Sequence, residues 1–183
     1  DYWNYDFDNP IVSESFNDLV SAYSAGGAAK AAVQGQIFCT GAGNDGSCAP
    51  SGIERIESMT INGPSVQTSG VDLFAEYQME IGGGILNIGT DISHTMEYEQ
   101  DAYFKGGILV GSAYDAAGFL NGGRSARPLP DLKGRVYGEY NLGDHNFLLY
   151  ANHITSYDDD RYAGVEVDAQ TTYDFHYQLS FLQ

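Results

Sequence analysis

Hydrophobic and polar residues alternate over long stretches of this chain. Residues 70–81 show the alternation most fully, because every second position from Val71 onward is apolar. These apolar positions are Val71, Leu73, Ala75, Tyr77, Met79 and Ile81. The intervening positions are Asp72, Phe74, Glu76, Gln78 and Glu80, and Phe74 is the exception among them. Successive side chains of a strand point to opposite faces, so the pattern predicts a strand with one apolar and one polar face.

The same signal recurs along the chain and predicts an all-β, antiparallel fold. Residues 2–8 alternate aromatic and polar side chains, and six longer strands follow. They are expected at 53–61, 66–81, 85–98, 132–142, 146–157 and 169–182. In the last of them Tyr173, Phe175 and Leu179 share one face, and Asp174 and Gln178 share the other. These strands run to roughly 9–16 residues, whereas strands of globular proteins usually have about 5–6.

One segment has helical spacing instead. Ser13 is the expected N-cap of this short helix, and Gly26 and Gly27 are expected to end it. Residues 28–38 fit either a strand or a loop. The apolar positions of the helix are Val12, Phe16, Leu19, Val20 and Tyr23.

Two cysteines, Cys39 and Cys48, enclose a loop rich in Gly, Asn and Asp. This arrangement predicts a disulfide in an oxidising compartment, and two unrelated thiols are the alternative. A metal site is disfavoured, because no histidine or second cysteine pair lies nearby. Residues 41–46 match G-x-G-x-x-G, but Pro50 and Gly52 follow too closely for the helix that a dinucleotide site needs.

The composition is strongly acidic. Asp and Glu number 25 against 8 Lys and Arg, which gives a net charge of −17 and argues against a nucleic-acid partner. Such a surface suits cations or a cation-bridged anionic environment. No apolar run reaches the ~18 residues of a membrane-spanning helix. We expect no signal peptide, because the chain opens within an alternating pattern.

Strand length and connection length together favour a transmembrane β-barrel. The connections at 81–85 and 141–146 are tight, whereas residues 99–130 form a long loop. A barrel puts lipid against its apolar face and water against its polar face, with short turns on one side and long loops on the other. The residues expected to face lipid are Leu73, Tyr77, Met79, Tyr173, Phe175 and Leu179. The residues expected to face the lumen are Asp72, Glu76, Glu80, Asp174 and Gln178.

Four segments resemble the barrel of TonB-dependent outer-membrane receptors of Gram-negative bacteria. They are "DYWNYDFDNPI", "NGPSVQTSGVDLFAEY", "RPLPDLKGRVYGEY" and "HITSYDDDR". The stretch from Asn62 to Asp72, which leads into a long alternating strand, is the most specific of them, and the entry at Pro128 to Leu132 supports it. The resemblance rests on the order of these pieces and covers most of the chain.

This resemblance implies a 22-stranded barrel closed by an N-terminal plug. It also implies TonB-driven import of a small nutrient ligand: a ferric siderophore, cobalamin or a carbohydrate. The expected partners are outer-membrane lipid, lipopolysaccharide and the TonB complex, and no cofactor is expected. Residues 1–183 contain neither a plug nor a TonB box, and they end in "LSFLQ" rather than in a terminal aromatic residue. We therefore expect them to be an internal to C-terminal part of one barrel domain.

No catalytic residues or metal ligands emerge, so we expect a protein that is not an enzyme. Asp158, Asp159, Asp160 and Arg161 form a charged cluster that is either a solvated loop tip or a contact for a substrate or divalent cation. The four histidines, His94, His145, His153 and His176, are scattered.

Two alternatives and one question of topology stay open. The alternatives are a small eight-stranded outer-membrane barrel and a secreted acidic β-sandwich that binds calcium or glycans. The question is which side carries the disulfide loop. If the tight turns at 81–85 and 141–146 face the periplasm, residues 9–52 need one more membrane crossing, for which Lys30–Phe38 is the candidate. Otherwise the disulfide loop lies on the outer side.

Overall fold

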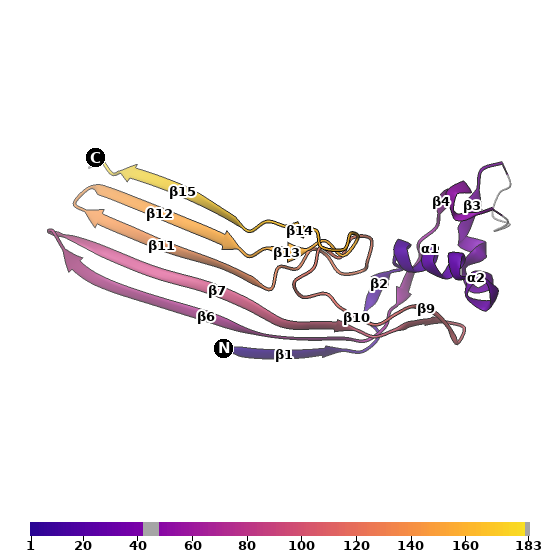
Figure 1. Ribbon diagram of the computed structural model, residues 1–183. Coiled ribbons are helices and arrows are strands. Elements are labelled where there is room, and N and C mark those ends of the chain that lie inside the picture. Colours follow the sequence, from indigo (N-terminus) through magenta and orange to yellow (C-terminus); the bar gives the residue numbers. More distant parts are fainter. Residues whose placement is uncertain (42–47, 182–183) are drawn as a thin grey trace.

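A long antiparallel sheet dominates the computed structural model, which describes residues 1–41 and 48–181. Six strands follow one another across it in the order β1-β6-β7-β11-β12-β15, and the short β10 (Tyr114–Asp115) pairs with β7 (Figure 1). Their bounds are β1 Tyr2–Phe7, β6 Val66–Ile81, β7 Gly84–Gln100, β11 Leu132–Leu142, β12 His145–Ile154 and β15 Gln170–Leu179. The all-β antiparallel expectation is therefore confirmed.

Each predicted strand has a counterpart, and two of them are divided. β7 is longer than the predicted 85–98 at both ends, and β15 is shorter than the predicted 169–182, whose last residue lies outside the described residues. The bounds predicted for 66–81 and 132–142 coincide with β6 and β11. The predicted strand 146–157 is divided, because β12 ends at Ile154 and β13 (Tyr157–Asp158) pairs with β14 (Glu166–Val167). The predicted strand 53–61 is wrong as one unit: β4 (Ile53–Ile56) pairs with β3 (Ile37–Cys39), and β5 (Thr60–Asn62) pairs with β2 (Ile11–Ser13). The predicted strand is therefore two short strands, because each half pairs with a different strand.

The helical segment begins later than its sequence predicts. Ser15 caps α1 (Phe16–Ala25) by accepting a hydrogen bond from the Asp18 amide. Ser13, the predicted cap, lies instead in β2 opposite Thr60. Gly26, at φ +76°, ends α1 as predicted, but Gly27 begins a second helix, α2 (Gly27–Val33). A 3₁₀ turn, η1 (Gln34–Gln36), connects α2 to β3, so most of 28–38 is helical. Neither helix of the described residues has the length and apolar character needed to cross a membrane.

The connections of the sheet are segregated by length. The tight turns at residues 82–83 and 143–144 lie at one end, here called the turn end. The connections β1–β6, β7–β11 and β12–β15 all lie at the other, the loop end (Figure 1). The disulfide segment therefore lies at the loop end. Lys30–Phe38 makes no crossing, because it consists of α2, η1 and the start of β3.

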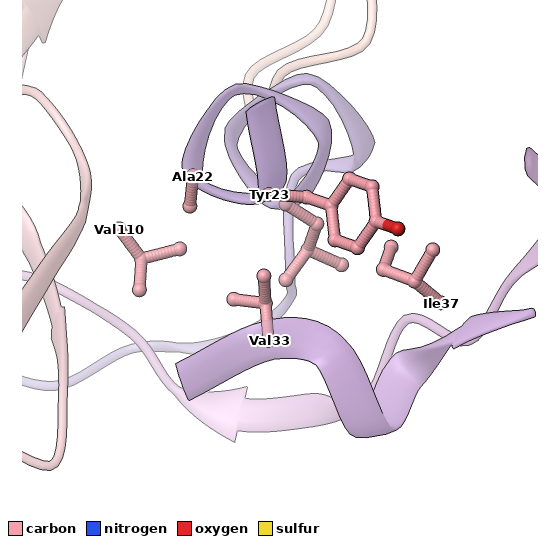
Figure 2. Packing of buried hydrophobic residues seen from close by; sticks show 6 residues of the cluster. Ala22, Tyr23, Val33, Ile37 and Val110 are labelled. Carbon is pink, nitrogen blue, oxygen red and sulfur yellow. The ribbon is translucent and has the colours of Figure 1, made fainter. Parts of the chain in front are cut away.

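The main cluster of buried hydrophobic residues lies at the loop end, outside the long sheet. α1 and α2 pack against the hairpin of β8 (Tyr103–Lys105) and β9 (Ile108–Gly111) (Figure 2). We call residues 11–41, 48–62 and 103–111 the loop-end unit. Its buried cluster comprises Leu19, Ala22, Tyr23, Val33, Ile37 and Val110.

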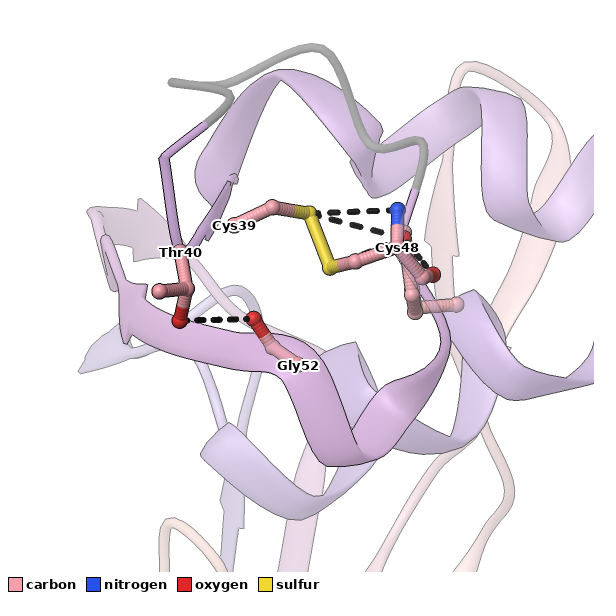
Figure 3. Close-up of a disulfide and its surroundings, with 5 residues drawn as sticks. Cys39, Thr40, Cys48 and Gly52 are labelled. Carbon is pink, nitrogen blue, oxygen red and sulfur yellow. Dashed lines mark hydrogen bonds between the residues drawn. A yellow bond between two sulfur atoms is a disulfide. The ribbon is translucent and has the colours of Figure 1, made fainter.

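A disulfide closes this unit, as predicted. Cys39 and Cys48 are bonded with an S–S distance of 2.05 Å (Figure 3). Cys39 is buried, and the Tyr23 hydroxyl donates a hydrogen bond to the Cys48 carbonyl at 2.5 Å. The Thr40 hydroxyl donates to the Gly52 carbonyl at 3.4 Å. The disulfide therefore ties β3 to the segment that precedes β4, beside the helical core.

Candidate functional site

The register of the sheet aligns side chains of one character across five strands. One row of directly paired residues is Glu76, Gly89, Tyr137, Tyr150 and Asp174. The next row, on the opposite face, is Tyr77, Ile88, Gly138, Leu149 and Phe175. Each face of the sheet therefore keeps one character across the five strands, and we call them the polar face and the apolar face.

The apolar face is open to its surroundings. Leu73 is 53% exposed, Tyr77 61% and Phe175 65%. In a soluble sandwich a second sheet would pack on these side chains. The six residues expected to face lipid all lie here, and their contact with lipid stays a prediction.

This apolar surface is a band of limited height. On β6 it runs from Val71 to Ile81, which is about 34 Å along a strand at ~3.4 Å per residue. Further toward the loop end the same face carries Ser69 opposite Glu97. Leu179 lies opposite His145 at the turn end, so Leu149 and Phe175, rather than Leu179, mark the middle of the band.

Aromatic rings line the edge of the band at the turn end. The rings of Phe147 and Tyr177 lie 5.1 Å apart, and His145 Nδ1 lies 2.8 Å from the Tyr177 hydroxyl. The Tyr140 hydroxyl donates a hydrogen bond to the Ile81 carbonyl at 3.0 Å. Such amphipathic rings are typical of the boundary between hydrocarbon and water.

The polar face carries hydrogen-bonded carboxylates. Glu139 accepts bonds from Asn87 at 3.2 Å and from Asn146 at 2.6 Å, and Asp174 accepts one from Asn152 at 2.9 Å. The five residues expected to face the lumen, Asp72, Glu76, Glu80, Asp174 and Gln178, all lie on this face.

Near the loop end, the polar face also holds a shallow pocket of about 340 Å³. The polar-face residues that line it are Asp91 and Ser93 from β7, Lys133 and Arg135 from β11, and Asn152 and Ile154 from β12. Gly134 and His153, which pair with each other in a row of the apolar face, complete the lining. Arg135 Nη2 lies 3.8 Å from Asp91 Oδ2, with both side chains about half exposed. Both hydrogen-bond donors and acceptors therefore converge there. The alternating pattern places these side chains on one face, but only the register brings the three strands together.

The predicted cluster at 158–161 joins two loops. Asp159 is 6% exposed, and Arg161 donates two side-chain hydrogen bonds to it, at 2.8 and 2.6 Å. These bonds hold the pKa of the Asp159 carboxyl below its usual value. Asp160 accepts hydrogen bonds from the Gly122 amide and from Arg124, both at 3.0 Å. Asp159 and Asp160 are therefore no solvated loop tip, and contact of the cluster with a substrate stays a prediction.

A buried charge network at the loop end was not predicted. Glu14, 4% exposed, accepts hydrogen bonds from Lys105 and Tyr103, both at 2.9 Å, and from the Met59 amide at 3.1 Å. Gln36 is a further donor to Glu14. Burial alone would raise the pKa of Glu14, but these bonds outweigh it and lower the pKa. Burial and the adjacent carboxylate raise the pKa of Tyr103.

Its partners lie 22 to 91 positions from Glu14 in the chain, so no local pattern could have indicated this network. Among residues 1–41 and 48–181, no group of three His, Cys, Asp or Glu side chains is arranged to hold a metal ion. Comparisons of the chain with protein-family models, with curated proteins and with solved structures find no match.

Proposed function

We propose that this chain forms part of the barrel wall of a TonB-dependent receptor in the bacterial outer membrane. The receptor binds a scarce nutrient and imports it with energy from the TonB complex. Residues 1–183 belong to one barrel domain, and the plug and the TonB contact belong to other parts of the intact protein. The nutrient is of the ferric siderophore, cobalamin or carbohydrate type.

The open apolar band carries this proposal. Outer-membrane barrels have an outward apolar band about 25 Å tall, flanked by aromatic girdles, and a polar interior. The stretch from Val71 to Ile81, about 34 Å along the strand, spans a height of about 26 Å at the ~40° tilt of such strands. Tyr140, Phe147 and Tyr177 supply rings at one edge of the band. Lipid and lipopolysaccharide are the partners proposed for this face.

The separation of short turns from long connections also supports the barrel and gives its orientation in the membrane. Such barrels have short periplasmic turns and longer extracellular loops. The turn end then faces the periplasm, and the loop end with its disulfide faces the outside. An extracellular position also agrees with a disulfide, which persists in oxidising surroundings.

Two adjacent leucines of β12 test the membrane placement. Leu149 lies on the apolar face opposite Phe175, and Leu148 lies on the polar face opposite His176. In the intact protein in lipid vesicles, Leu149→Arg should lower the free energy of unfolding by about 2–4 kcal/mol, because its charge enters the hydrocarbon near mid-band. Leu148→Arg, which places its charge beside Glu139, should cost far less.

Urea unfolding of both variants measures the difference. Equal losses at the two positions would contradict a lipid-facing band. The transport step is checked separately, because a protonophore should stop uptake of the nutrient by whole cells while leaving its binding intact.

A further inference from the structure

The polar face has an aromatic ring where its pattern calls for a polar side chain. Phe74, the exception in the alternation of β6, is 67% exposed and lies directly opposite Asp91. Asp91 and Arg135 are paired in the next two strands and line the pocket on this face. An exposed aromatic ring beside hydrogen-bonding groups offers a surface on which an apolar part of a ligand can stack.

A second ring flanks the same pocket. The Tyr150 ring lies 5.3 Å from the Arg135 guanidinium and 5.9 Å from the Tyr137 ring. Phe74 on β6 and Tyr150 on β12 therefore lie next to residues that line the pocket, Phe74 opposite Asp91 and Tyr150 beside Arg135.

Charged groups of both signs lie in and beside the pocket. Asp91, Lys133 and Arg135 line it. Asp72 lies opposite the lining residue Ser93, and Asp174 accepts a hydrogen bond from the lining residue Asn152. An uncharged ligand loses nothing by electrostatic repulsion here, whereas an anion meets the carboxylates and a cation meets Lys133 and Arg135.

Building on the receptor function proposed above, we propose that this pocket binds an uncharged oligosaccharide. Sugar hydroxyls both donate and accept hydrogen bonds, so they match carboxylate and amide acceptors beside ammonium and guanidinium donors. The apolar C–H faces of pyranose rings match the exposed rings of Phe74 and Tyr150. A pocket of about 340 Å³ lies within the usual range for small ligands.

Calorimetric titration of the intact detergent-solubilised protein with maltohexaose, xylohexaose, laminarihexaose and chitohexaose tests the proposal. At least one of these neutral sugars should bind. Phe74→Ala should weaken that binding about three- to tenfold through loss of ring stacking. Tyr77→Ala is the matched control, because Tyr77 is a comparably exposed ring of β6 on the opposite face, and its removal should change the affinity less than twofold.

Three results would overturn the proposal. One is that none of the four sugars binds at millimolar concentration, and another is that both ring variants weaken binding equally. The third is that only the anionic hexagalacturonate binds and that Lys133→Gln abolishes it, which would assign the pocket to an anion. The Leu148 and Leu149 comparison does not depend on this ligand, so failure of the sugar site leaves the membrane placement standing.

Discussion

At the scale of single residues, glycines let aromatic rings lie across neighbouring strands. The Trp3 indole of β1 lies over Gly70 of β6, and the Tyr137 ring of β11 lies over Gly89 of β7. A Cβ at Gly70 would overlap the indole and the backbone carbonyl of His94. Gly138 contrasts with these, because a Cβ there would meet no atom within 4 Å.

We predict that Gly70→Ala lowers the free energy of unfolding by about 1–3 kcal/mol, because the indole and a strand backbone must both shift. Gly138→Ala should leave stability unchanged or slightly higher, since it fills open space and restricts the unfolded chain. Urea unfolding of the two variants of the intact protein measures this. A larger loss of stability for Gly138→Ala than for Gly70→Ala would contradict a stabilising role for the packing of Trp3 on Gly70.

The buried network supports a second comparison at this scale. Lys105→Met should lower the stability of the loop-end unit by about 2–3 kcal/mol, because it leaves the Glu14 carboxylate buried without its cation. Arg55→Met removes an ion pair with Glu57 whose side chains are about half exposed and a contact with the Phe38 ring, so it should cost less, about 1 kcal/mol. Hydrogen exchange of the α1 amides measures both effects. Equal protection in the two variants would contradict a stabilising role for the Glu14–Lys105 pair.

At the scale of elements, the loop-end unit and the sheet are stabilised differently. The unit has a buried cluster, a disulfide and an internal ion pair. The sheet from Leu73 to Ile81 is held by backbone ladders with both faces exposed. Loss of packing in one element should therefore leave the other in place.

We predict that replacing both Cys39 and Cys48 with Ser lowers the stability of the loop-end unit by at most about 2–3 kcal/mol, because the short loop is no longer closed in the unfolded state. Amides of α1 should exchange faster, while those of β11 and β12 keep their protection. Uniformly faster exchange across α1, β11 and β12 would show that the unit and the sheet unfold together.

At the scale of the whole molecule, the described sheet has two open edges. β1 covers only residues 66–71 of β6, and β15 pairs with β12 alone among the described strands. Unpaired backbone groups in hydrocarbon cost several kcal/mol each. The proposed barrel therefore needs further strands at both edges.

Residues 1–183 expressed alone should accordingly fail to fold in detergent. Gel mobility with and without heating, together with the β signal in circular dichroism, measures this. The intact protein serves as the control and should be heat-modifiable. A monomeric, heat-modifiable barrel from residues 1–183 would instead support the small eight-stranded alternative.

The sequence by itself determined the features that depend on neighbouring residues. The alternation in β6 predicted its bounds and the two characters of its faces, because side-chain direction along a strand follows from local backbone geometry. The bounds of β11 were also predicted correctly. Cys39 and Cys48 were paired correctly, because the loop between them is short and contains no other cysteine.

Only the tertiary structure decided which segments meet. Pairing with β2 separates β5 from β4 and moves the helix start from Ser13 to Ser15. Register places Phe74 beside Asp91 and Arg135, and packing buries Glu14 against Lys105. Each of these contacts joins residues far apart in the chain, and its free energy depends on burial and hydrogen bonding in the assembled fold. Local periodicity of the sequence carries no information about burial or hydrogen bonding between such distant segments.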